Sequence, residues 1–146
     1  MIGLLQRVRE ASVTVNGALV GAIGQGLLLL VCAEPTDTDA QAAKLVDKLL
    51  KLRIFSDAVG KMNRSLVDVQ GGLLVVSQFT LAADVRRGNR PGFSAAAGPE
   101  QGRALYEAVL RMARERHPVV QAGIFGADMQ VALVNDGPVT IPLHIS

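Results

Sequence analysis

Short apolar runs separated by turn signals fill the first part of the chain. Residues 12–15 alternate polar and apolar side chains, residues 18–23 form a second run, and Asn16-Gly17 lies between them. Both central positions of a tight hairpin turn need a positive φ, so Asn-Gly in this place predicts a β-hairpin. The all-apolar run Leu27–Cys32 has the length of a strand that is buried on both faces.

Two later segments carry a helical period. The first begins at Pro35–Asp39, where Thr36 and Asp39 stand at the spacing of a capping box. The second begins near Pro99, which suits the first turn of a helix, and ends at His117-Pro118. Each segment has one apolar stripe, so each helix is expected to pack one side on a sheet. The stripes comprise Ala42, Leu45, Val46, Leu49 and Leu50 in the first helix and Leu105, Val109, Met112 and Ala113 in the second.

The rest of the chain alternates between strand-like runs and polar segments. Residues 56–70 are expected to be irregular, and residues 82–99 form a loop whose length is typical of functional segments. Pro142 places the last strand at a sheet edge or a bulge. The expected strands are residues 52–55, 73–76, 129–134 and 139–145, with Asn135-Asp136-Gly137-Pro138 as the turn between the last two.

These elements predict one α+β domain over residues 1–146. The early hairpins favour this class over a doubly wound α/β fold, and a β-barrel with helices on its outside is the alternative. We expect mixed or antiparallel sheets that form a β-barrel-like core with two main helices packed outside. With 49% hydrophobic and 19% charged residues, the chain can bury such a core.

Charge and cysteine content bear on the binding partners and the cellular compartment of the protein. A net charge of +2 does not by itself indicate a nucleic-acid-binding protein, although Arg86, Arg87 and Arg90 cluster in the long loop. Cys32 is the sole cysteine and lies in an apolar run, so no intramolecular disulfide can form, which fits a reducing compartment. No apolar run approaches the ~18 residues of a membrane span. We expect a cytoplasmic protein without a signal peptide or membrane contact.

Most familiar catalytic motifs are missing. His117 and His144 have no Ser, Cys or Asp at a motif spacing, and no Gly-x-Ser-x-Gly occurs. The distribution of Cys, His and acidic residues gives no metal-ligand spacing, and no phosphate-binding glycine pattern follows a strand. We therefore expect neither a metal nor a cofactor.

The segment after the strand 73–76 is the most unusual candidate site. Ser77-Gln78-Phe79-Thr80 places two hydroxyls and an amide at the end of an apolar strand, with no base beside them. Thr80 alone would be a poor nucleophile. The arginine cluster follows closely and is suited either to solvent or to phosphate.

Ser77–Leu81 together with Asn135–Thr140 resembles the D-aminoacyl-tRNA deacylase (D-tyrosyl-tRNA deacylase) family. The likeness covers essentially the whole chain, and one departure is Gly92, where the family more often has Ser. Further matching stretches are Met1-Ile2, Gln6-Arg7-Val8, Gly26-Leu27-Leu28, Arg53–Asp57, Gly60–Asn63, Arg90-Pro91, Phe93 and Gly126–Val131.

The resemblance implies a proofreading hydrolase that cleaves the ester between a D-amino acid and the 3′ end of tRNA. It implies a homodimer with active sites at the subunit interface, where a cis Gly-Pro motif enters the partner's site and turns its carbonyls to the substrate's α-amino group. Carried over to this sequence, that motif is Gly137-Pro138. Arg7 would support it across the interface, and Phe125 and Met129 would help line the pocket.

The resemblance also implies a role for the polar strand end. It implies that the 2′-hydroxyl of the tRNA's terminal ribose takes the place of a protein nucleophile. Ser77, Gln78, Phe79 and Thr80 would then form the catalytic rim, in which backbone N–H groups around Phe79 and Thr80 stabilise the oxyanion and Gln78 holds the ribose. An L side chain would collide with the Gly-Pro motif, whereas D-aminoacyl and glycyl esters would fit.

Two alternatives remain at this point. A relative that proofreads L-alanine on the wrong tRNA shares the fold but holds its Gly-Pro bond trans. Arg7 and Phe79 favour the D-specific form. A nucleic-acid-binding module without hydrolysis would use Arg86, Arg87 and Arg90, but it leaves Gly137-Pro138 unexplained.

Overall fold

A six-stranded mixed sheet forms the centre of the molecule in the computed structural model, which describes residues 1–146. Its strand order is β2-β1-β3-β6-β7. β2 and β3 pair with successive parts of one edge of β1, and β8 pairs along the opposite edge. The β3–β6 and β6–β7 pairs are parallel, whereas β1 is antiparallel to all its partners. The strands are β1 (Ile2–Val15), β2 (Ala18–Ile23), β3 (Gly26–Cys32), β6 (Gly72–Ser77), β7 (Val120–Ala122) and β8 (Gln130–His144).

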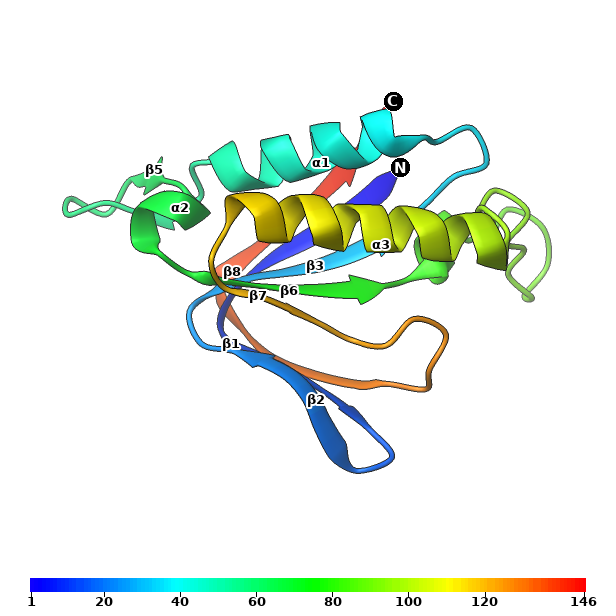
Figure 1. The fold of residues 1–146 in the computed structure, drawn as a ribbon, viewed down its shortest axis with the longest axis horizontal. Helices are drawn as coiled ribbons and strands as arrows, with labels where there is room; N and C mark the ends of the chain where they lie inside the picture. Colours follow the sequence, from blue (N-terminus) through cyan, green and yellow to red (C-terminus); the bar gives the residue numbers. More distant parts are fainter.

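The long strand β1 gives the sheet its barrel-like curl. Its first half pairs with β3, from Ile2 opposite Cys32, and its second half pairs with β2, from Ala11 opposite Ile23. The outer parts of β1, β2 and β8 therefore turn away from the rest of the sheet (Figure 1). The α+β class and the nearly closed barrel-like core agree with the sequence prediction.

The two main helices lie side by side on one face of the sheet (Figure 1). They are α1 (Asp39–Lys51) and α3 (Pro99–Arg116), with Pro99 in the first turn of α3 and His117 as its C-cap, as predicted. The predicted stripe of α1 is fully buried, and in α3 only Met112 is partly exposed. A large core fills the space between helices and sheet, and a smaller one, including Val8, Val13 and Leu74, fills the curled part. None of the helices combines the length and the apolar character that a membrane span requires.

Several local expectations need correction. Thr38, not Thr36, caps α1: its hydroxyl accepts from Ala40 N at 3.2 Å, and the Gln41 side chain accepts from Thr38 N at 2.7 Å. Gln41 is long enough to reach back to the cap, as the capping-box geometry requires. Residues 56–70 are more ordered than expected, because Ser65 caps a short helix there. The additional elements are β4 (Phe55–Ser56), β5 (Met62–Arg64), α2 (Leu66–Val69) and the 3₁₀ helix η1 (Phe79–Ala82).

The stretch Asn135–Pro138 is not a turn between two strands. It stays within β8, which remains paired with β1 on both sides of it, and the register shifts near Val8 absorb the extra residues as bulges. The Gly137-Pro138 peptide bond is cis. The sequence suggested a turn because Asn, Asp, Gly and Pro favour turns locally, but the continuous partner strand keeps this segment extended.

Candidate active site

A cavity of about 650 Å³ opens where β6 ends and η1 begins. Its walls come from the ends of β3 and β6, the amino end of α3 and the segment before β8. Most lining residues are apolar, and three of the four predicted rim residues, Ser77, Gln78 and Phe79, lie on it. A concave, mainly apolar cavity with a few polar groups at one edge has the features of a small-ligand site.

Hydrogen bonds fix the polar rim of this cavity. The backbone N–H of Gln78 donates to Val31 O at 2.8 Å, which holds the chain to β3 just after β6 ends. Leu81 N then donates to Gln78 O at 3.2 Å and closes the turn. The side-chain amide of Gln78 donates to the hydroxyl of Thr80, which is exposed. Thr80 does not line the cavity itself, and the group beside its hydroxyl is an amide and not a base.

The titratable side chains in the cavity wall stay protonated at neutral pH. Burial raises the pKa of the Cys32 thiol, which lies 3.6 Å from Phe79 O. Burial also raises the pKa of Tyr106 to about 12, and its hydroxyl donates to Val75 O at 3.1 Å. No carboxylate or imidazole lines the cavity. The site can orient a ligand and donate hydrogen bonds, but it offers no general base.

The two histidines are occupied elsewhere. His117 is buried, and its Nε2 lies 2.6 Å from Gly71 O at the opposite end of β6. His144 Nε2 lies 2.9 Å from a carboxylate oxygen of Glu34. Neither histidine lines the cavity, so the structure brings neither one to Ser77 or Thr80.

Aromatic side chains give the cavity its shape. Phe79 packs edge-on against Phe93, with ring centroids 4.9 Å apart. On the far wall, Phe125 lies 5.8 Å from the Tyr106 ring, and Met129 Sδ accepts from Ile124 N at 3.4 Å. Phe125 and Met129 both lie on the cavity wall.

Gly137 and Pro138 lie outside this cavity. They follow Asp136, whose carbonyl accepts from Arg7 Nε at 3.0 Å. Cys32 of the cavity wall pairs with Ile2, whereas Thr140 beside the motif pairs with Gln6, so motif and cavity are separated by about 13 Å along β1. Arg7 contacts the motif of its own chain, whereas the resemblance placed this contact across the subunit interface. The motif does not reach the cavity of the same chain.

Comparisons with known proteins show which family the chain belongs to. The family model described as D-Tyr-tRNA(Tyr) deacylase matches residues 4–144. The chain belongs to this deacylase family. A D-aminoacyl-tRNA deacylase of Methylibium petroleiphilum is 69% identical over 145 residues, covering 99% of this chain and 95% of that protein. One of Aromatoleum aromaticum is 63% identical, with 99% and 95% covered.

Two solved structures extend the comparison. One described as "c-Myc DNA Unwinding Element Binding Protein" superposes with a TM-score of 0.95 at 42% identity, covering 100% of this chain and 99% of the other. A probable eukaryotic D-amino acid tRNA deacylase superposes with a TM-score of 0.84 at 20% identity, covering 97% of each chain. The second likeness shows the deacylase fold alone.

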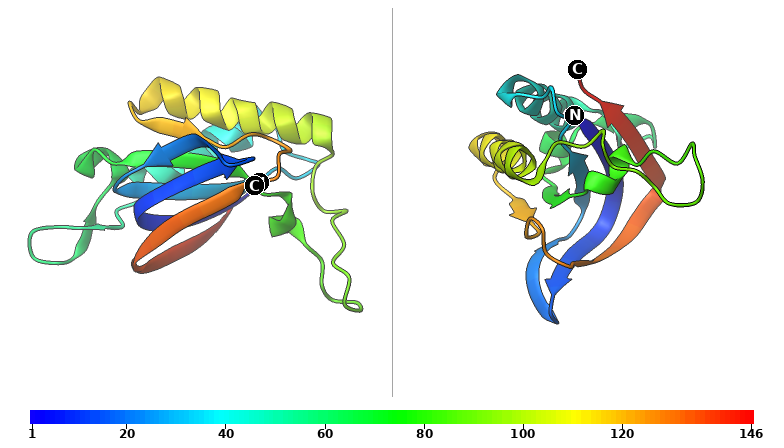
Figure 2. Two further views of the ribbon diagram at one scale, coloured as in Figure 1. Left: turned by 90° about the horizontal axis from the view of Figure 1, so that it is seen from below. Right: turned by 90° about the vertical axis from the view of Figure 1, so that its right-hand side faces the viewer.

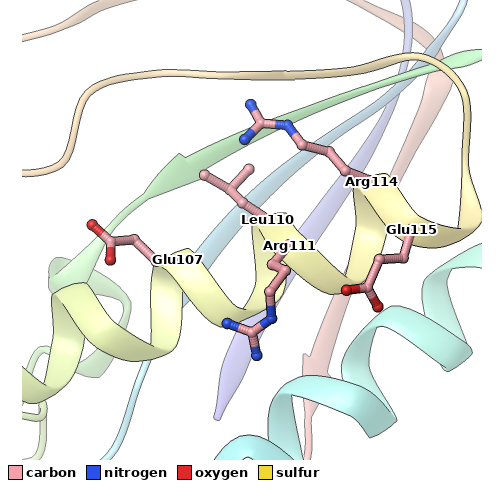
Figure 3. A pocket seen from close by; sticks show the side chains of 5 residues that line it. All are labelled: Glu107, Leu110, Arg111, Arg114 and Glu115. Atoms are coloured by element: carbon pink, nitrogen blue, oxygen red, sulfur yellow. The ribbon is translucent and has the colours of Figure 1, made fainter.

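A second hollow, of about 430 Å³, lies on the outer surface of α3 (Figure 3). Charged side chains of both signs surround one leucine there, and all of them come from a single helix. This surface has no counterpart among the residues that carry the resemblance to the deacylase family. It is lined by Glu107, Leu110, Arg111, Arg114 and Glu115.

Sequence reasoning did not assign Tyr106 or Phe93 to a site, although both line the cavity. Tyr106 interrupts the apolar stripe of α3, and a tyrosine among buried aliphatic residues usually has a hydrogen-bond partner for its hydroxyl. That signal was present in the sequence. Phe93 lies in the long loop, and nothing local indicated that its ring reaches Phe79.

Proposed function

We propose that this chain hydrolyses the ester of D-aminoacyl-tRNA and releases free tRNA and the D-amino acid. The observation that carries the proposal is a cavity with a hydrogen-bonding rim and no base, in a chain that matches D-aminoacyl-tRNA deacylases over its full length. Such a cavity suits a substrate that supplies its own hydroxyl. The vicinal 2′-hydroxyl of the terminal adenosine is that group.

In the proposed reaction the 2′-hydroxyl orients and activates a water molecule. The water oxygen bonds to the ester carbonyl carbon, the bond to the ribose 3′ oxygen breaks, and that oxygen takes up a proton. Phe79 and Thr80 begin η1, so their N–H groups lack partners within that helix and can donate to the oxyanion. One such donor contributes about 3–4 kcal/mol, and good orientation of the reactants about 7–11 kcal/mol.

The chiral filter is proposed to come from a second copy of the chain. Gly137 and Pro138 are exposed, and β8 pairs with β1 alone, so its other side is free along the sheet edge. In a homodimer the motif of one copy would enter the cavity of the other and hold the α-amino group by its two carbonyls. With the amino group fixed, an L side chain strikes the motif, whereas a D side chain points outward.

Glycyl-tRNA is expected to be a second substrate. Glycine has no side chain to collide with the motif, so a filter that works by rejection accepts it. For the same reason the identity of the D side chain is expected to matter little, since no pocket grips it.

A deacylation time course with D-Tyr-tRNA, L-Tyr-tRNA and Gly-tRNA tests the proposal at low enzyme concentration, with a reaction lacking enzyme as control. Loss of the D and glycyl esters alone is the expected result. Hydrolysis of both the D-tyrosyl and the L-tyrosyl ester would overturn the proposal that the Gly-Pro motif rejects L-amino acids. Loss of neither, with cleavage of L-Ala-tRNA, would assign the chain to L-alanine proofreading.

A further inference from the structure

Residues 84–92 form a closed arm that projects from the deacylase cavity. Two backbone hydrogen bonds close its base, from Asp84 N to Gly92 O at 2.8 Å and from Gly92 N to Asp84 O at 2.9 Å. Every residue from Val85 to Gly92 is exposed. Figure 2 shows the yellow-green loop between η1 and α3 extending away from the sheet. The arm therefore contributes little to the core, and its exposed side chains are accessible to a ligand.

The arm carries an excess of positive charge. Asp84 is its one acidic residue, and that carboxylate is taken by Arg86, through Nε at 2.9 Å and Nη2 at 2.7 Å. The same pairing holds the pKa of Asp84 below its usual range, so the carboxylate stays ionised. Arg87 and Arg90 are exposed, and neither takes part in any ion pair within the chain. Two guanidinium groups are thus available to an anion.

Both ends of the arm join the rim of the cavity. Its first residue follows η1, which carries Thr80, and its last residue precedes Phe93. Phe93 lines the cavity and packs against Phe79, which is 56% exposed. A chain-like anion lying along the arm would therefore have its end at the rim where the proposed ester is cleaved.

We propose that Arg87 and Arg90 bind the phosphodiester backbone of the single-stranded 3′ end of the tRNA. This inference rests on the proposed function, because it places on the arm the nucleotides that precede the esterified adenosine of the proposed substrate. A guanidinium group can donate two parallel hydrogen bonds to one phosphate. Backbone contacts position a nucleic acid without reading its sequence, which suits an enzyme that must accept many different tRNAs.

The test compares two substrates that share the ester but not the phosphates. D-Tyr-tRNA is measured beside the 3′ D-tyrosyl ester of adenosine, which has no phosphodiester. The variants are Arg87→Gln and Arg90→Gln, singly and together. Arg111→Gln is the control, because it removes the same charge from a half-exposed side chain of α3, which pairs with Asp39 of α1 at 3.6 Å (Figure 3).

The double variant is expected to lose at least about tenfold in kcat/KM for D-Tyr-tRNA, mainly through KM, and to cleave the adenosine ester within about twofold of the original rate. A plot of log kcat/KM against log salt should become shallower by about 1.4 for two single-strand phosphate contacts. The Arg111→Gln enzyme should match the original chain in all of these measurements.

Unchanged kcat/KM on D-Tyr-tRNA in the double variant would overturn the inference, as would an equal loss on both substrates. If the original chain cleaves neither substrate, the proposed function fails. Binding of deacylated tRNA, measured by fluorescence anisotropy, then tests separately whether the arm binds tRNA. The inference is supported if the double variant binds tRNA more weakly than the original chain and the Arg111→Gln variant does not. Equal binding by the double variant and the original chain overturns the inference. Duplex DNA that binds as tightly as tRNA, with the same dependence on Arg87 and Arg90, would also overturn the assignment to the tRNA end.

Discussion

The guanidinium group of Arg7 lies against Gly137 so closely that a Cβ on residue 137 would be 3.1 Å from Arg7 Nη2. The same Cβ would be 2.9 Å from a methyl carbon of Val139, and Gly137 has φ +130°. Arg7 also donates to Asp136 O at 3.0 Å and to Ile54 O at 2.7 Å. The backbone before Pro138 is therefore held by one arginine in a conformation and a space that only glycine fits.

Gly137→Ala is expected to reduce kcat/KM on D-Tyr-tRNA by at least about tenfold and to lower the free energy of unfolding by about 1–3 kcal/mol, because the φ and the close contacts both resist a side chain. Deacylation assays and urea titrations measure the two effects. Gly24→Ala is the control, since Gly24 has no positive φ and a Cβ there meets nothing within 4 Å. A Gly137→Ala enzyme as active and stable as the Gly24→Ala enzyme would contradict this account.

Comparing Arg7→Ala with Arg9→Ala distinguishes two roles of Arg7: hydrogen bonding to the backbone at the Gly-Pro motif, and the positive charge near Asp136. Both side chains lie near the carboxylate of Asp136, but that of Arg7 is 12% exposed and that of Arg9 76% exposed. Removing Arg7 leaves two carbonyls without their donor and should lower kcat/KM by about tenfold or more, whereas removing Arg9 should change it less than about twofold.

Arg7→Lys is expected to behave like Arg7→Ala. A single ammonium group lacks the planar fork that serves Asp136 O and Ile54 O together. Full activity of the lysine variant would mean that the positive charge at this place matters and the fork does not.

Thr80→Ala tests which hydroxyl takes part in the chemistry. Thr80 has an amide and no base beside it, so the variant should keep its kcat within about tenfold of the original chain. A tRNA that ends in 2′-deoxyadenosine should instead lose about a hundredfold or more, the scale of a lost acid–base group. Single-turnover deacylation measures both. The reverse ranking would make Thr80 the nucleophile.

Tyr106 is expected to make the protein sensitive to alkali. Its pKa is raised to about 12 from an ordinary value near 10, so the folded state holds its proton where the unfolded state has lost it. Stability from this group is complete below pH 10 and is lost as the pH rises from about 10 to about 12. Thermal melts should show a smaller alkaline fall in Tm for Tyr106→Phe.

At neutral pH the same substitution has a separate cost. The phenol donates to Val75 O at 3.1 Å, so Tyr106→Phe should lower the free energy of unfolding by about 1 kcal/mol there. Equal alkaline slopes in the two proteins would show that Tyr106 ionises in the folded state as easily as in the unfolded one.

The sequence by itself determined the elements whose signals are local. Asn16-Gly17 marked the first hairpin, Pro99 and His117-Pro118 bounded the long helix, and one-sided stripes identified the faces that α1 and α3 bury. These signals work because turn conformations, caps and helical periodicity depend on residues close in the chain. Two sequence motifs sufficed to indicate the deacylase family for the same reason, since each is a short contiguous stretch.

Only the tertiary structure decided where those motifs lie relative to each other. The same turn-forming residues, Asn135–Pro138, are held in a bulged strand because β1 runs beside them for its whole length. That shared strand also carries Gly137 away from the cavity at Ser77 and brings it to Arg7. Register between strands distant in sequence is set by packing across the whole sheet, and no local pattern contains it.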